Sequence, residues 1–326
     1  MNILVTGGAG YIGSATAEAL LRAGHTVTVY DSLVTGHREA VPAGATFVEA
    51  SLDDRPAVTR VLTEGRFAAV MHFAAFIEAG ESMRYPGRFY FNNLNNSISL
   101  MEEAALAGVK RFVLSSTAAV YRSSNEPLTE DSPLGPTNVY GHTKLVVEQT
   151  LEWYRQIHGL HYAALRYFNA CGAVPGRGEA HSPESHLIPR VLQVALGQAE
   201  AATIFGTDYP TPDGTCIRDY VHIADLVSAH LLALDALESK DALIYNVGSG
   251  QGFSVRQVVE AARAVTGHAI PAIEELRRAG DPPRLVASSD KIRRELGWKP
   301  EHSDLKEMVS SAWEWHKSHP EGYDSQ

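Results

Sequence analysis

A glycine-rich segment between two strand-like runs constrains the fold of this chain most. Ile3-Leu4-Val5 is typical of a short buried strand, and it leads into Gly7-Gly8-Ala9-Gly10-Tyr11-Ile12-Gly13. The spacing Gly8-x-Gly10-x-x-Gly13 matches the dinucleotide-binding fingerprint, whose glycines let the backbone approach a pyrophosphate at the start of the next helix. A helix is expected over about 12–22 and a second strand over 26–30. The whole unit predicts a dinucleotide site, against the alternative of a glycine-rich turn with no ligand.

The second strand ends in an acidic residue, Asp31. In dinucleotide-binding units, a carboxylate about 20 residues past the glycines binds the ribose hydroxyls of adenosine. The same carboxylate repels the 2′-phosphate that distinguishes NADP from NAD. We therefore expect NAD to be the cofactor.

Strand-like and helix-like segments keep alternating along the first half of the chain. The expected elements are strands at 47–48, 68–73, 112–114 and 163–167, and helices at 54–64, 88–107 and 140–157. Repeated β-α units with almost continuously apolar strands predict an α/β fold with a doubly wound parallel sheet of Rossmann type.

Glycine and proline become more frequent from about residue 170, which indicates a second lobe. The helices expected there lie near 187–197, 222–237, 254–265 and 303–317. We expect residues 1–169 to form the NAD-binding Rossmann domain, to which the chain can return later. Residues 170–326 are expected to form mainly a smaller α/β substrate-binding lobe.

Tyr140 and Lys144 are four residues apart, so on the expected helix they share one face. A free phenol has a pKa near 10, and bringing it to about 7 requires roughly 4 kcal/mol of preferential phenolate stabilisation. A nearby ammonium group and a second cation can supply this. Such a phenolate can take a proton from a sugar hydroxyl while a nicotinamide takes the hydride.

The Tyr-x-x-x-Lys spacing is common on amphipathic helices, so it needs support from elsewhere in the chain. Thr117 stands at the carboxyl end of an expected strand, where parallel sheets bind their ligands. We therefore expect Thr117 and Tyr140 to face one pocket. The alternative for Thr117 is a residue that only caps the end of its strand.

Composition excludes several classes of function. The net charge is −10, which leaves no broad basic surface for nucleic acid or an anionic membrane. Only Cys171 and Cys216 are present, so neither a disulfide framework nor a cysteine zinc site is expected, and no metal is expected elsewhere. The N-terminus has no leader of signal-peptide type and no apolar run approaches a membrane span, so the expected location is the cytoplasm.

Longer motifs extend beyond these features. They are Thr6 to Gly13, His72 to Ala75, Gly80 to Ser82, Ser115 to Tyr121, Tyr140 to Lys144, Leu165 to Asn169, Ile204 to Thr211, Asp213 to Tyr220 and Arg277 to Pro282. With these motifs the chain resembles the UDP-glucose 4-epimerase (UDP-galactose 4-epimerase) family of extended short-chain dehydrogenases/reductases, from Asn2 to about Tyr323. The glycine and Tyr/Lys motifs mark only the superfamily, whereas the blocks around Phe205 to Tyr220 and Arg278 are more specific to epimerases of nucleotide sugars.

The resemblance implies a set of cofactor contacts. In it, Tyr11 and Ile12 donate backbone N–H groups to the pyrophosphate, and Lys144 binds the nicotinamide ribose. The residues expected to bind NAD are Gly7, Gly10, Tyr11, Ile12, Gly13, Asp31, Ser32, Leu33, Thr35, Gly36, Ser51, Leu52, Phe73, Ala74, Ala75, Ile77, Asn92, Thr117, Tyr140, Lys144 and Phe168.

A second set is implied for the UDP-sugar. Thr117 and Tyr140 contact the sugar hydroxyl, and the guanidinium groups of Arg218 and Arg278 suit a diphosphate because they are planar forks of fixed charge. The full set is Thr117, Tyr140, Asn169, His186, Leu187, Thr203, Phe205, Arg218, Arg278, Asp281 and Leu285. Phe73, Phe168 and the two arginines could instead be ordinary core and surface residues.

The implied reaction is the interconversion of UDP-glucose and UDP-galactose at carbon 4, with Tyr140, Lys144 and Thr117 as catalytic residues. Hydride passes from carbon 4 to tightly bound NAD, which gives a transient 4-keto sugar. This sugar rotates about its bond to the diphosphate, and hydride returns to its opposite face. UDP must therefore be held tightly and the hexose loosely. A homodimer is implied by the resemblance alone, through packing of helices at about 88–107 and 138–157.

Four positions depart from the family pattern. Ser51 replaces the usual adenine-contacting Asp, Thr117 replaces the Ser of some members, and Arg122 replaces a Gly. Leu285 occupies the position that limits pocket size, so UDP-N-acetylhexosamines are further candidate substrates.

Two other functions remain open at this point. In a nucleotide-sugar 4,6-dehydratase, Asp-Glu follows the active-site Thr, whereas here Ala118 and Ala119 stand there. A non-catalytic dinucleotide sensor would have no chemical need for a Thr, Tyr and Lys set.

Overall fold

The computed structural model describes residues 1–278 and 281–323. The chain divides into two compact units. Unit 1 comprises Met1–Arg122, Pro133–Arg166 and Val227–Tyr245, and unit 2 comprises Ser123–Ser132, Tyr167–Leu226 and Asn246–Gln326. The assignment of cofactor binding to the first part of the chain and of sugar binding to the later part stays a prediction.

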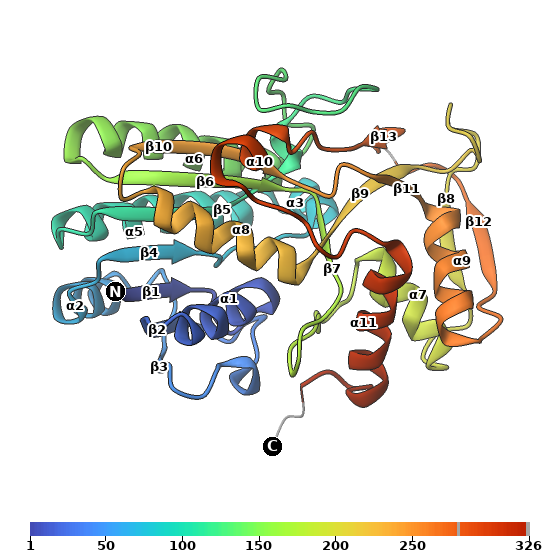
Figure 1. Cartoon of the computed structure of the whole chain (residues 1–326), viewed down its shortest axis with the longest axis horizontal. Coiled ribbons are helices and arrows are strands. Elements are labelled where there is room, and N and C mark those ends of the chain that lie inside the picture. The colour runs from blue at the N-terminus through green and yellow to red at the C-terminus, as the bar shows by residue number, and fades with distance from the viewer. Residues whose placement is uncertain (279–280, 324–326) are drawn as a thin grey trace. The chain divides into compact units, whose positions relative to one another are not determined.

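A seven-stranded sheet forms the centre of unit 1 (Figure 1). Its strands, in spatial order, are β10 (Ala242–Val247), β6 (His161–Tyr167), β5 (Arg111–Thr117), β4 (Ala69–His72), β1 (Asn2–Thr6), β2 (Thr26–Asp31) and β3 (Thr46–Glu49). The pairs from β5 to β3 are parallel, with Leu4 of β1 opposite both Thr28 and Val70. The predicted α/β fold with a doubly wound sheet is confirmed.

Helices pack on this sheet because their apolar faces match those of its buried strands. They are α1 (Tyr11–Arg22), α2 (Arg55–Gly65), α5 (Asn96–Leu106), α6 (Val139–His158) and α8 (Ile223–Ala236), with shorter turns η1 (Arg38–Ala40), α3 (Ala79–Arg84), α4 (Pro86–Phe89) and η3 (Ala118–Val120). Apolar residues of α2, α5 and α6 share one core with β1, β4 and β5. Figure 1 shows α1 and α8 in front of the strands.

The long helix expected over 88–107 is present, and it contains a π-helical turn. It consists of α4, the turn η2 (Tyr90–Asn95) and α5. Asn93 lies in this turn, and its side chain bonds both the N–H and the C=O of Phe76, each at 2.8 Å. A π turn re-aims side chains that a regular helix would place elsewhere, and such turns occur frequently at functional sites.

Unit 2 contains smaller sheets and four helices among the described residues. Its elements are β7 (Asn169–Cys171), α7 (Leu187–Ala195), β8 (Ala202–Phe205), β9 (Ile217–His222), β11 (Gly252–Ser254), α9 (Val255–Thr266), β12 (Ala272–Glu275), β13 (Arg284–Leu285), α10 (Asp290–Leu296) and α11 (Leu305–Ser318). β9 pairs with β7, β11 and β13, and β8 pairs with β12. Apolar residues of α7, α9 and α11 form the core of the unit. Across the described residues of both units, no helix is long and apolar enough to cross a membrane.

Candidate active site

The glycine-rich loop lies at the carboxyl end of β1 and leads into α1, as the sequence predicts. Gly7 has a φ of 72°, and a Cβ there would lie 2.5 Å from the backbone nitrogen of Ala74. A Cβ on Gly13 would lie 2.1 Å from the carbonyl oxygen of Gly7. Only glycine fits either position, so the loop and the first turn of α1 form a close-packed backbone cradle of the kind that accepts a pyrophosphate.

Asp31 connects this cradle to the loop that follows β2. Its Oδ2 accepts the N–H of Ala9 at 3.0 Å, and its Oδ1 accepts the N–H of Leu33 at 2.9 Å. Burial raises the pKa of Asp31, and these backbone hydrogen bonds oppose the rise. Each carboxylate oxygen can accept a further hydrogen bond, so ribose hydroxyls remain suitable partners. Gly36 lies against the same carboxylate.

The remaining predicted cofactor residues of unit 1 follow neighbouring strand ends. Ser51 and Leu52 follow β3, where the carbonyl of Ser51 accepts the hydroxyl of Tyr30 at 2.8 Å. Phe73, at the end of β4, packs its ring 4.9 Å from that of His230. Asn92 lies in the π turn and donates to Asn93 at 2.9 Å. The residues at hand therefore fit a dinucleotide such as NAD.

Tyr140 and Thr117 are brought together, as expected. The side chain of Thr117 interacts with the phenol and favours its ionised form. The Oγ1 of Thr117 also accepts the N–H of Ala119 at 3.1 Å, which leaves its hydrogen to donate to the phenol. Thr117 thus both caps η3 and contacts Tyr140, so the capping alternative and the predicted contact hold together.

The helix that carries Tyr140 begins where two polar side chains fix it. Asn138 caps α6 by accepting the N–H of Gly141 at 2.8 Å. Ser82 accepts the N–H of Tyr140 itself at 3.1 Å. A Cβ on Gly141 would lie 2.3 Å from the carbonyl oxygen of Ala119, so glycine lets α6 approach η3 backbone to backbone.

The acidity of Tyr140 differs from the expectation. Burial raises the pKa of Tyr140 to about 12, the hydrogen bond from Thr117 opposes this, and the charge of Glu78 adds to the rise. Lys144 does not lower the pKa of Tyr140 in this structure. Its Nζ instead donates to the carbonyl of Ser115 at 2.9 Å. The expected lowering of the Tyr140 pKa by Lys144 together with a second cation therefore stays a prediction for the site with its cofactor bound.

Lys144 is itself buried beside a second charged pair. Burial lowers its pKa to about 8, and the carboxylate of Glu148, one turn later on α6, opposes the change. Glu148 accepts the Nη2 of Arg166 at 2.6 Å, and both side chains are 3% exposed. Arg166 also donates to the hydroxyl of Tyr121 at 2.8 Å. Lys144 thus lies one turn after Tyr140 on α6, next to the ion pair of Glu148 and Arg166.

The arginines predicted to hold the diphosphate lie in unit 2. Arg218 of β9 donates to the carbonyl of Pro282 at 2.8 Å and lies 3.4 Å from the carboxylate of Asp281. Leu285 of β13 is opposite Arg218 in the strand register. The guanidinium carbon of Arg278 lies 3.8 Å above the ring of Phe205. Ala279 and Gly280 of the same motif lie outside the described residues.

Asn169 is held by the strand next to Arg218. Its amide donates to the carbonyl of Asp219 at 2.8 Å. The side chain of Asp219 is completely buried and accepts four hydrogen bonds, from Ser249 N and Oγ, Gly250 N and Ala287 N. Burial raises the pKa of Asp219 to about 6, and these donors limit the rise. The carboxylate thereby fixes the backbone around β9.

The other predicted substrate residues of unit 2 are distributed over three elements. Leu187 begins α7, and Thr203 lies in β8 opposite Ile273. His186, directly before α7, is bonded to Glu179 and Glu184. Phe168, which is predicted to bind the cofactor, donates its N–H to the carbonyl of Val247 at 3.3 Å and is 8% exposed. No contact between His186 and Arg218 or Arg278 is present among the described residues.

The model of the NAD dependent epimerase/dehydratase family matches residues 3–248. The chain belongs to this family. A UDP-glucose 4-epimerase of Corynebacterium glutamicum is 50% identical over 314 residues, which cover 96% of this chain and 95% of that protein. One crystal structure of a UDP-glucose 4-epimerase has a TM-score of 0.97 at 48% identity and covers 100% of both chains. Another, from Bifidobacterium longum in complex with NAD⁺ and UDP, has a TM-score of 0.94 at 34% identity, covering 99% of this chain and 100% of that one.

Membership of the epimerase/dehydratase family confirms the resemblance and the predicted NAD cofactor. Sequence reasoning did not assign a role to Ser82, Asn93 or Asn138, which position the Tyr140 turn and the π turn. The signal for Ser82 was available, because Gly80-Glu81-Ser82 was recognised as a motif. Asn138 lies two residues before the helix expected at 140–157, and Asn is a favoured N-cap residue.

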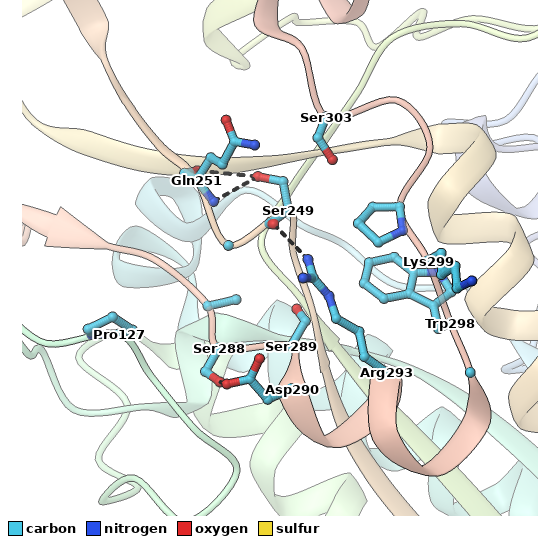
Figure 2. Close-up of a pocket in the computed structure, with 14 residues that line it drawn as sticks. Pro127, Ser249, Gln251, Ser288, Ser289, Asp290, Arg293, Trp298, Lys299 and Ser303 are labelled. Atoms are coloured by element: carbon cyan, nitrogen blue, oxygen red, sulfur yellow. Dashed lines mark hydrogen bonds between the residues drawn. The ribbon is translucent and has the colours of Figure 1, made fainter.

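Unit 2 of this family member also has a cavity of about 800 Å³ (Figure 2). None of the predicted site residues lines it. Its polar groups bond one another: Arg293 donates to the carbonyl of Ser249 at 3.0 Å, and Ser288 donates to Asp290 at 3.0 Å. The cavity is therefore separate from the residues predicted to form the site.

Proposed function

We propose that the protein interconverts UDP-glucose and UDP-galactose by inverting carbon 4 of the sugar. One observation carries the proposal: the side chain of Thr117, at the end of β5, interacts with the phenol of Tyr140, and Lys144 is buried one turn later on α6. The relatives named UDP-glucose 4-epimerase, at about half identity over the full length, support the same reaction.

Tyr140 is the group that takes the proton of the 4-hydroxyl and later returns it. Thr117 donates to the phenol oxygen and so stabilises the phenolate at the moment of transfer. Lys144, fixed on Ser115, supplies a cation one turn below. NAD, when bound, supplies the hydride acceptor at carbon 4 and, in its oxidised form, a positive charge that favours the phenolate.

The nucleotide half of the substrate has to be bound tightly, because the sugar rotates to present its opposite face between the two proton transfers. Arg218 and Arg278 carry fixed positive charge for the diphosphate. Asp281 and Phe205 hold these two guanidinium groups in place. We propose that the UDP-binding residues named from the sequence act in this way.

The two alternative functions are not favoured. Ala118 and Ala119 offer no acid or base for the elimination that a 4,6-dehydratase performs. A dinucleotide sensor has no chemical use for the hydrogen bond between Thr117 and Tyr140.

Replacing the phenol tests the proposal directly. Tyr140→Phe is expected to keep its bound NAD and to lower kcat for UDP-galactose by about 10²–10⁴-fold, since it removes one acid-base group. NAD content is measured after heat release, and turnover is measured with no cofactor added. The matched control is Tyr162→Phe, a buried tyrosine outside the predicted site, which is expected to keep its turnover. Near-normal turnover in Tyr140→Phe would refute the assignment.

The same assay addresses the substrate range. Leu285 leaves space that a larger aromatic residue would fill, so we propose that UDP-N-acetylglucosamine is also accepted. No turnover of that substrate beside normal turnover of UDP-glucose would end this extension. The cytoplasmic location stays a prediction from the sequence.

Exposed apolar side chains gather on the helices of unit 1, and we propose that a second copy of the chain covers them. They are Met83, Tyr85, Phe91, Leu106, Trp153 and Ile157, each between 58% and 69% exposed. All lie on or beside α3 to α6, the region from which a homodimer is expected. Trp153→Glu should shift the sedimentation coefficient from dimer to monomer, and an unchanged coefficient would contradict this surface.

A further inference from the structure

Four ligand-type side chains cluster in the loop between β7 and α7. They are Glu179, His181, Glu184 and His186, spaced as Glu-x-His-x-x-Glu-x-His. One ligand atom from each lies within 4.8 Å of all the others. The Nδ1 of His186 is 2.7 Å from Glu179 and 2.9 Å from Glu184, and the Nδ1 of His181 is 3.2 Å from Glu179.

The charges of this cluster do not balance as those of an ordinary ion pair do. The two glutamate side chains are only 6% and 5% exposed, yet both carboxylates approach the same ring nitrogen of His186. One N–H can point well at only one acceptor. Two carboxylates in a poorly solvated loop repel each other, and here the imidazole of His186 lies between them.

The neighbouring groups hold the cluster in place. The backbone N–H groups of Ser185 and His186 donate to the Oε1 of Glu184 at 2.7 and 2.8 Å. His316 of α11 is close enough for the charges of Glu179 and Glu184 to raise its pKa, although burial, the larger effect, lowers it. A Cβ on Gly178 would lie 2.1 Å from the ring of Trp315, so α11 supports the loop at close range. The carboxylates are therefore fixed at short separation by contacts on more than one side.

We propose that Glu179, His181, Glu184 and His186 together bind one divalent transition-metal ion, with Zn²⁺ as the best match. Imidazole nitrogen and carboxylate oxygen are both zinc ligands, at about 2.0–2.2 Å. Ligand atoms around a tetrahedral ion lie roughly 3.4 Å apart at these bond lengths. Side-chain rotations that move each ligand atom by less than about 1 Å bring the four atoms to that spacing.

Four protein ligands close the coordination shell, so the site is structural. The ion would join both ends of the segment 179–186 and fix the chain directly before α7. Binding displaces the protons that His186 and His181 share with the carboxylates, so metal uptake releases protons. This inference shares His186 with the proposed UDP-binding set, but it assigns no step of the reaction to the metal.

Metal content is measured on protein made without a histidine tag and purified without chelator or immobilised metal. Elemental mass spectrometry is expected to find about one zinc ion per chain. The chelated protein is then titrated with Co²⁺, whose visible absorption reports tetrahedral coordination by nitrogen and oxygen. Competition with a chromogenic chelator gives the zinc affinity.

Two ligand variants and one control decide the proposal. His181→Ala and Glu184→Gln are expected to weaken zinc binding by more than about 100-fold, beyond the 10–100-fold typical of lost supporting groups. The control is His302→Ala, because His302 also pairs with a glutamate, Glu307 at 2.5 Å, but does not belong to a four-ligand cluster among the described residues. His302→Ala should bind zinc as the unchanged protein does.

Several outcomes would overturn the site. They are a metal-free wild type that takes up no Co²⁺, a spectrum without tetrahedral character, and equal zinc affinity in wild type and Glu184→Gln. Should His181→Ala not fold, the nearly isosteric Glu184→Gln carries the test by itself. Epimerase turnover is recorded alongside, so that loss of metal with retained chemistry still supports the site and leaves the reaction assignment unaffected.

Discussion

Two buried charged clusters, one in each unit, have opposite imbalances. In unit 1, the carboxylate of Glu148 faces two cations, Arg166 at 2.6 Å and Lys144 one turn away. In unit 2, the carboxylates of Glu179 and Glu184 both approach one imidazole nitrogen of His186. The first cluster has a surplus positive charge and the second a surplus negative charge.

The sign of each surplus agrees with what we propose the site receives. In unit 1 the surplus cation, Lys144, lies beside a phenol that must become an anion, and burial lowers the pKa of Lys144 to about 8. In unit 2 the surplus carboxylates would be neutralised by a metal cation. A buried cluster with matched charges needs nothing further, whereas an unmatched one indicates the charge of a missing partner.

The largest effect is expected from breaking the matched part of the first cluster. Glu148→Ala leaves the guanidinium of Arg166 buried without its carboxylate, which should lower the free energy of unfolding by about 3–5 kcal/mol. Urea unfolding measures this. Glu152→Ala, on the same helix but in a pair 29% and 37% exposed, serves as the control and should lose no more than about 1 kcal/mol. Equal losses in the two variants would remove the contrast between matched and exposed pairs.

A smaller effect of opposite sign is expected from removing the surplus cation. Lys144→Met should raise the free energy of unfolding at pH 7 by about 2 kcal/mol, because the folded state disfavours the buried ammonium. Turnover should fall in the same variant. The folded-state pKa of Lys144, about 8, is below its ordinary 10.5, so the destabilisation is complete below pH 8 and disappears as the pH rises towards 10.5.

Urea unfolding at pH 7 and pH 9.5 tests this pH dependence. The difference in the free energy of unfolding between Lys144→Met and wild type should be smaller at pH 9.5, because Lys144 of the folded wild type is mostly uncharged there. A variant that is less stable than wild type at pH 7 would show that the hydrogen bond to Ser115 outweighs the desolvation of Lys144.

Much of unit 1 could be predicted from sequence because its signals are local. The glycines around Gly7, the acidic end of β2 at Asp31 and the Tyr140–Lys144 spacing each lie within one β-α unit. The contact between Thr117 and Tyr140 followed from the rule that ligands meet the carboxyl ends of strands. The pKa of Tyr140 could not be predicted, since it depends on burial and on Glu78, which is distant in sequence.

Other features depend on long-range contacts or on a spacing of common residue types that has no specific motif. Within the π turn at Tyr90–Asn95, Asn93 reaches Phe76, and helical periodicity alone gives a continuous helix. The Glu-x-His-x-x-Glu-x-His segment was visible in the sequence. A search restricted to paired cysteines passes over it, because histidine and glutamate are common in loops.

The bare position at Gly141 has a consequence for how this enzyme can change over time. Main-chain atoms of α6 and η3 touch there, and these atoms are the same whatever the surrounding side chains become. The distance between the hydroxyls of Thr117 and Tyr140 therefore does not depend on the size of the neighbouring core side chains. While residue 141 is glycine, substitutions in the hydrophobic core can occur without changing the positions of Tyr140 and Thr117.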